Sequence, residues 1–77
     1  MSKAVKVDKD YVEKVVKEDL IRKYPDITEL EFVRVTFTCK WWMAGGIFST
    51  ARGLKRVFMY VVDGETGEII EYTILVM

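Results

Sequence analysis

The first polarity pattern in the chain is helical. Between residues 10 and 24, apolar side chains recur every three or four positions, with charged residues between them. This spacing predicts an amphipathic helix. We expect the helix to begin at about Asp8 or Asp10. Asp10, followed three residues later by Glu13, fits a capping box, and Pro25 marks the end of the helix. A helix this short is not stable alone, so its apolar stripe must pack against another element. The stripe contains Val12, Val15, Val16, Leu20 and Tyr24.

Residues 29–42 alternate in the manner of a long strand. One alternating set contains Val33, Val35, Phe37, Cys39 and Trp41. The other set contains Phe32, Arg34, Thr36, Thr38, Lys40 and Trp42. We predict that the first set faces the core, with Cys39 as a small buried residue.

The alternation stops at residues 43–53, where three glycines stand among small residues. We predict a loop here, and it is unusually apolar because it contains Met43, Ile47 and Phe48.

Two further strands are predicted at residues 54–63 and 68–77, joined by a tight turn at residues 64–67 whose two glycines suit a hairpin. Pairing Asp63 with Glu68 directs three apolar residues of the first strand toward the helix: Val57, Met59 and Val61. The same pairing leaves Arg56, Phe58 and Tyr60 on the opposite face. A slip of one residue exchanges the two faces.

Together these elements predict a single α+β domain over residues 1–77, with one N-terminal helix packed on an antiparallel sheet. The sheet has three strands, or four if residues 3–7 form a strand rather than a loose arm. With 51% apolar and 13% aromatic residues, the chain has enough apolar content to fold.

The composition offers little chemistry for catalysis. Histidine is absent and Cys39 is the only cysteine, so Ser-His pairs, Cys-His pairs and thiolate metal clusters are excluded. Gly45-Gly46 lacks the spacing of a phosphate-binding loop. We therefore expect neither an enzyme nor a bound cofactor or metal.

The chain shows no apolar run long enough to span a membrane and no signal-peptide core, and its lone cysteine fits a cytoplasmic protein. Asparagine and glutamine are also absent while charged residues make up 31%, a composition typical of thermophile proteins.

The apolar segment around the two tryptophans is the first candidate for function. Adjacent residues of a strand point to opposite faces, so only one of the two tryptophans can join the core. We predict that this segment binds a protein or peptide partner, as an exposed apolar anchor does. The alternative is that it closes one end of the core. The predicted partner-binding residues are Trp41, Trp42, Met43, Gly45, Gly46, Ile47 and Phe48.

A second candidate is single-stranded nucleic acid. All charges between residues 32 and 62 are positive, and basic residues interleaved with aromatic ones on a sheet can stack bases. The candidate residues are Arg34, Lys40, Arg56, Phe58 and Tyr60. Against this hypothesis, 12 basic and 12 acidic residues give a net charge of zero. Two further alternatives are that these charges pair across strands with Glu71, or that this face is buried in a homodimer.

The order helix, strand, long loop, strand, tight turn, strand resembles the cystatin-like fold, which includes stefins and PepSY-type domains. Residues 60–69, Tyr-Val-Val-Asp-Gly-Glu-Thr-Gly-Glu-Ile, are similar to the hairpin common in PepSY domains. Stefins block papain-like proteases with an N-terminal segment and two hairpin loops. The resemblance places these parts at residues 2–5, 42–48 and 64–67, although the Gln-x-Val-x-Gly loop motif is absent. It implies a protease as one possible partner.

Overall fold

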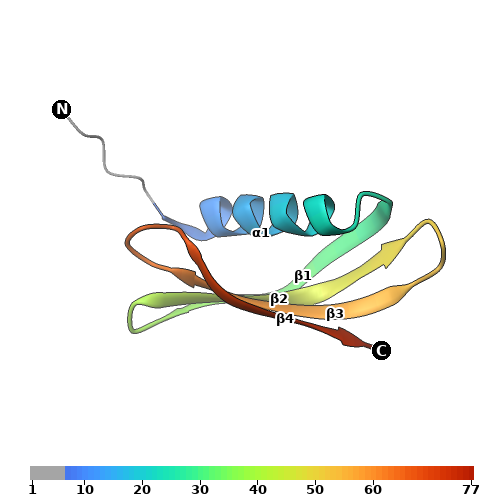
Figure 1. The fold of residues 1–77 in the computed structure, drawn as a ribbon. Coiled ribbons are helices and arrows are strands. Elements are labelled where there is room, and N and C mark those ends of the chain that lie inside the picture. Colours follow the sequence, from blue (N-terminus) through green and yellow to red (C-terminus); the bar gives the residue numbers. More distant parts are fainter. Residues whose placement is uncertain (1–6) are drawn as a thin grey trace.

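A computed structural model describes residues 7–77 and contains one helix on a four-stranded antiparallel sheet (Figure 1). The elements are α1 (Lys9–Lys23), β1 (Ile27–Thr38), β2 (Trp41–Thr50), β3 (Lys55–Asp63) and β4 (Ile69–Val76). The strands lie in the sheet in chain order, β1-β2-β3-β4. The predicted α+β class is confirmed, in its four-stranded form. The fourth strand is β2, whereas most of residues 3–7 lies outside the described residues.

The helix lies where its periodicity predicts, and its apolar stripe faces the sheet. Val12, Val16 and Leu20 are fully buried. The cap, however, is Asp8 rather than Asp10: the backbone N–H of Tyr11 donates a hydrogen bond to the Asp8 carboxylate at 2.9 Å. Such a bond satisfies one of the free N–H groups of the first helical turn.

The predicted long strand followed by a loop is wrong. Residues 27–50 form a β-hairpin instead, with a two-residue turn at Cys39 and Lys40. Cys39 is exposed in this turn, not buried, and has a φ of 58°. The glycines of the predicted loop lie inside β2. A Cβ at Gly46 would come within 2.0 Å of the Glu31 carbonyl oxygen, so the close approach of β1 requires glycine there.

A β-bulge in β1 explains why its predicted faces are mixed. Phe32 pairs with Gly46 and Arg34 with Gly45, so Val33 is the extra residue of the bulge. Phe32 and Val35 therefore both pack against the core, although they belong to different predicted sets. Val33 is 69% exposed, contrary to the prediction that it is buried.

A second bulge exchanges the predicted faces of β3. The N–H of Asp63 donates to the Glu68 carbonyl oxygen at 2.8 Å, as predicted at the turn. Beyond it, Val62 pairs with Ile69 but Val61 pairs with Glu71, so Ile70 is an extra residue. The slip places Phe58 and Tyr60 beneath the helix.

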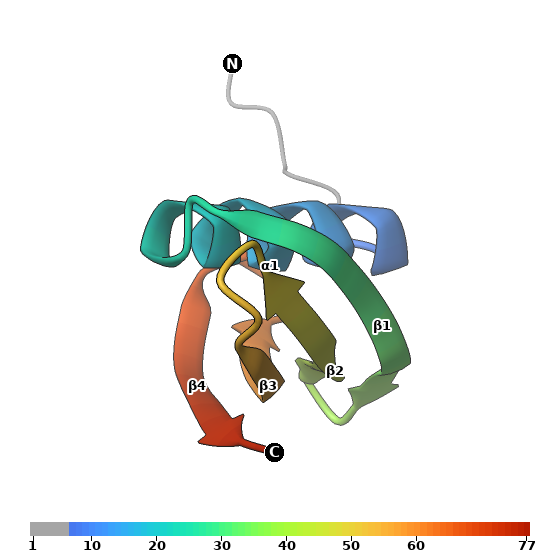
Figure 2. The ribbon, with the colours of Figure 1, turned by 90° about the vertical axis from the view of Figure 1, so that its right-hand side faces the viewer.

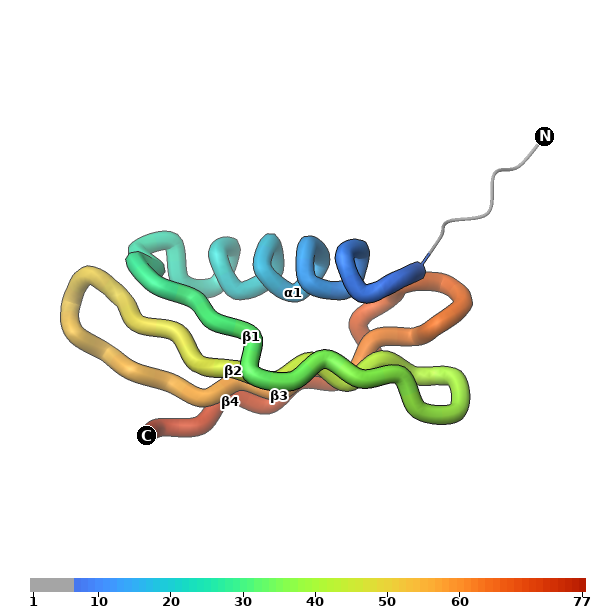
Figure 3. Tube along the Cα trace, turned by 180° about the vertical axis from the view of Figure 1, so that it is seen from behind, coloured from blue at the N-terminus to red at the C-terminus, as the bar shows by residue number. Residues whose placement is uncertain are grey.

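Residues 7–77 thus form two layers, in which α1 covers one face of the sheet. The sheet curves around α1, which lies along its concave side (Figure 2). Seen from behind, the helix again lies on one side of all four strands (Figure 3). The core between the layers is formed by Val12, Val16, Leu20, Ala44, Phe48, Phe58, Tyr60 and Val62.

Candidate protein-binding surface

The face of the sheet turned away from α1, here called the outer face, carries a continuous apolar strip along its two central strands. Side chains directly opposite each other in an antiparallel pair share a face, so the strand pairing identifies its members. The strip consists of Trp41, Met43 and Ile47 from β2 and Val57, Met59 and Val61 from β3, with Leu75 of β4 beside Val57.

These residues are more exposed than large apolar side chains of a folded core. Trp41 is 40% exposed, Met59 48% and Leu75 57%, whereas Phe58 on the opposite face is 1% exposed. Exposed apolar area costs about 25 cal/mol per Å² relative to burial. A connected apolar strip of this kind marks an interaction surface more often than scattered exposed residues do.

Polar side chains frame the strip on both sides. Along β1 the outer face presents Glu31, Arg34, Thr36 and Thr38, and along β4 it presents Glu71 and Thr73. Neither Arg34 nor Glu71 forms an ion pair within residues 7–77. An apolar centre with a polar rim is the usual anatomy of a protein–protein interface.

The structure divides the predicted partner-binding residues between the two faces. Trp41, Met43 and Ile47 lie on the outer face, with Gly45 between them. The others, Trp42, Gly46 and Phe48, lie on the helix side. The two tryptophans point to opposite faces, and Trp42 is the one that packs against the core. Its ring centroid lies 5.2 Å from that of Phe37.

Sequence reasoning misses four residues of the strip. Val57, Met59 and Val61 belong to the outer face, whereas the predicted register, which is one residue off, assigns them to the helix side. Leu75 of β4 also belongs to the outer face. The signal in the sequence is the apolar character of both faces of residues 57–62, which indicates a strand covered on both sides.

The residues predicted to bind nucleic acid are not brought together. Phe58 and Tyr60 are 1% and 0% exposed, so their rings are not available for base stacking. Arg34 lies on the outer face, Arg56 pairs with Phe48 and Val76 at the far end of the helix side, and Lys40 lies in the β1–β2 turn. The Lys40 ammonium lies 5.6 Å from the ring centroid of Trp41.

A polar network anchors the helix to the sheet. The Tyr60 hydroxyl and the Lys23 ammonium each donate a hydrogen bond of 2.6 Å to the buried Asp19 carboxylate. Burial alone would raise the pKa of Asp19, but these two hydrogen bonds and the charges of Lys23 and Arg22 outweigh burial and lower it. Burial and the bond to Asp19 raise the pKa of Tyr60. The network therefore keeps Asp19 charged and Tyr60 neutral at ordinary pH, which suits an anchor better than a proton-transfer group.

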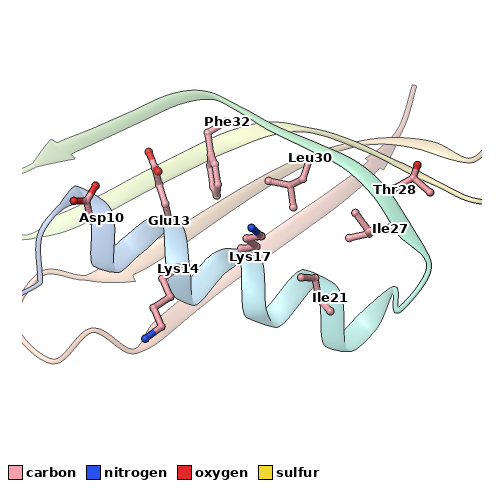
Figure 4. A pocket seen from close by; sticks show the side chains of 9 residues that line it. All are labelled: Asp10, Glu13, Lys14, Lys17, Ile21, Ile27, Thr28, Leu30 and Phe32. Atoms are coloured by element: carbon pink, nitrogen blue, oxygen red, sulfur yellow. The ribbon is translucent and has the colours of Figure 1, made fainter.

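A shallow groove runs between α1 and β1, with a volume of about 620 Å³ (Figure 4). Ile21, Ile27 and Leu30 form its apolar part, and its polar lining includes Asp10, Glu13, Lys14 and Lys17. The polar lining carries both signs of charge and so favours no single ligand charge. Within residues 7–77, no cluster of three metal-ligating side chains is present.

The two tight turns lie side by side at the end where α1 begins (Figure 1). The N–H of Gly64 donates to the Lys40 carbonyl oxygen at 2.8 Å, which joins the β3–β4 turn to the β1–β2 turn. Asp63 shapes the β3–β4 turn by accepting hydrogen bonds from the backbone N–H groups of Thr66 and Glu65. These bonds lower the pKa of Asp63.

No protein-family model, curated protein or solved structure matches this chain. Among the described residues, the only helix is too short and too polar to cross a membrane.

Proposed function

We propose that this chain is a small protein-interaction module, without catalytic activity of its own, that docks a protein partner on its outer face. One observation carries the proposal: the apolar strip from Trp41 to Leu75 is continuous, is framed by polar residues, and is not covered by any element between residues 7 and 77. The helix covers the opposite face, so the fold does not need the strip as a second core. A partner that buries the strip would recover the free energy lost by its exposure.

Oxidation of the two methionines of the strip tests this proposal without knowledge of the partner. Met43 and Met59 are 39% and 48% exposed, so dilute peroxide oxidises both in the free chain. N-acetylmethionine in the same sample serves as the reference for the reaction rate. An isotopically labelled chain is then added at low concentration to an extract of the cells that produce it. We expect the oxidation rates of Met43 and Met59 to fall several-fold in this extract. Unchanged rates in the extract and in concentrated pure protein alike would contradict the proposal.

Protease inhibition is a second candidate, favoured by the two adjoining turns at the end where α1 begins. A stefin-like wedge would present the β1–β2 turn and the β3–β4 turn together, and the Gly64–Lys40 hydrogen bond holds these turns side by side. The predicted wedge loop at residues 42–48 is a strand, so the β1–β2 turn takes its place. Residues 2–5 lie outside the described residues. A papain inhibition assay tests this candidate. Full papain activity at high micromolar concentrations of the chain would contradict protease inhibition.

A further inference from the structure

We infer that the partner docked on the outer face is a second copy of this chain, related to the first by a two-fold axis that runs along the strands between β2 and β3. This inference rests on the proposed function and names its occupant. Such an axis exchanges β2 with β3 and β1 with β4 of the other copy, as an isologous interface requires. The cross-strand pairs then decide which side chains meet.

The first complementary contact is steric. Gly45 of β2 pairs with Met59 of β3, so the two residues stand at the same height on either side of the axis. The rotation therefore places each Met59 over the Gly45 of the other copy. Gly45 has no side chain and forms part of a hollow of about 300 Å³ on the outer face. Arg34, Met43 and the Met59 of the same copy also line this hollow, so the two Met59 side chains would lie side by side across the axis. The flexible, exposed side chain of Met59 fits such a hollow, and the contact is made twice.

The second contact is electrostatic. Arg34 of β1 belongs to the row of Gly45 and Met59, and Glu71 of β4 belongs to the neighbouring row, that of Met43 and Val61. Exchange of β1 with β4 brings each Arg34 to within one row of the Glu71 of the other copy. Both charges lack an ion pair within residues 7–77. Both residues lie on the edge strands of the sheet, β1 and β4.

A two-fold axis across the strands fits less well. It would lay β2 over β2 and β3 over β3, so that Met59 would not meet the Gly45 of the other copy. It would also lay β1 over β1 and β4 over β4, which separates Arg34 from the Glu71 of the other copy. The steric contact and the Arg34–Glu71 contact are therefore both specific to the axis along the strands.

The area of the outer face is sufficient for a weak dimer. Four strands spaced about 4.8 Å apart, the shortest of them 8 residues long, cover at least roughly 500 Å² in each copy. The two copies together bury about 1,000 Å², the lower limit for a specific interface. We therefore expect a dimer that dissociates on dilution.

Sedimentation velocity of charge-reversed variants tests both the dimer and its axis. The wild-type chain should pass from its 9.0 kDa monomer to twice that mass as its concentration rises to about 1 mM. Arg34→Glu and Glu71→Arg should each weaken the dimer about tenfold or more, because each places like charges at the edge. The double variant Arg34→Glu/Glu71→Arg should restore dimerisation. Lys17→Glu, a reversal on the exposed part of the helix, should leave it unchanged.

Gly45→Val tests the steric contact separately. A Cβ at Gly45 would lie 3.5 Å from the Phe58 carbonyl oxygen, an ordinary contact, so the monomer accepts the new side chain. Valine also favours the strand conformation. We expect a folded monomer with an unchanged or higher melting temperature and no dimer at concentrations where the wild type is dimeric.

Three outcomes overturn the inference: a wild type that stays monomeric at about 1 mM, a dimer that Gly45→Val leaves intact, or a double reversal that does not restore dimerisation. After any of these outcomes, the proposed function still holds if Met43 and Met59 are protected from peroxide in the cell extract. A protein other than this chain then covers the outer face. Methionines unprotected under every condition contradict both proposals.

Discussion

The two faces of the sheet differ in what covers them, although the same strands build both. On β3, Phe58, Tyr60 and Val62 are buried beneath α1, while their neighbours Met59 and Val61 lie on the uncovered outer face. The side chains of the two faces are similar in size and hydrophobicity. We therefore expect an apolar side chain to stabilise this fold where the helix covers it, and we propose that the apolar side chains of the outer face serve a partner instead.

Neighbouring residues of β3 give the largest expected contrast. Phe58→Ala removes a buried ring that contacts the rings of Phe32, Phe48 and Tyr60, and should lower the free energy of unfolding by about 3–5 kcal/mol. Met59→Ala should change it by less than about 1 kcal/mol in the dilute monomer, because the side chain is half exposed. Urea unfolding at low protein concentration measures both. Equal losses would show that the outer face also serves as a core.

The two adjacent glycines of β2 should respond differently to a methyl group. Gly46→Ala forces a Cβ against the Glu31 carbonyl oxygen, which requires the backbones of β1 and β2 to separate, and should cost up to about 3 kcal/mol. Gly45→Ala, on the outer face, places its Cβ 3.5 Å from the Phe58 carbonyl oxygen, an ordinary contact, and should be neutral or slightly stabilising. Thermal melting of the two variants compares the same chemical change on opposite faces. A neutral Gly46→Ala would contradict the described pairing of β1 with β2.

Changes in the polar network of Asp19, Tyr60 and Lys23 should have a smaller effect on the free energy of unfolding, and this effect should depend on pH. Tyr60→Phe removes a hydrogen bond to a charged group and should cost about 2 kcal/mol near neutral pH. The folded-state pKa of Asp19 lies below its unfolded value, so the stability it contributes is present above the unfolded pKa and is lost as the pH falls through the folded one.

Acid unfolding isolates the contribution of this network. Tyr60→Phe removes one of the hydrogen bonds that lower the pKa of Asp19, so the variant should begin to unfold at a higher pH than the wild type. Circular dichroism followed from neutral pH to about pH 2 measures the shift. Asp19→Asn serves as the control background, because without the titrating carboxylate the further change Tyr60→Phe should move the acid transition less than it does in the wild type. Identical acid transitions of wild type and Tyr60→Phe would show that the network does not anchor the helix.

The sequence predicts the parts of this fold that depend on local signals. The helix follows from its apolar stripe and Pro25, and the last hairpin follows from the glycines at positions 64 and 67. The prediction of a loop in place of β2 fails, because Gly45 and Gly46 indicate flexibility in the sequence but serve close strand packing in the structure.

The assignment of the faces depends on non-local features. The bulges at Val33 and Ile70 each shift the alternation by one residue, and nothing in the local pattern marks them. They decide that Phe58 and Tyr60 form the core rather than a binding face. The sequence therefore predicts the candidate surface only in part, through Trp41, Met43 and Ile47, and its β3 and β4 members require the strand pairing.

Sedimentation velocity of Met59→Glu beside the wild type, both at about 1 mM, tests most directly the claim that one face builds the fold and the other docks a second copy. The variant places a charge at the centre of the outer face and leaves the helix side unchanged. We predict a compact monomer of 9.0 kDa for the variant and twice that mass for the wild type. A variant that sediments as the wild type does, or as an expanded or aggregated chain, would contradict the claim.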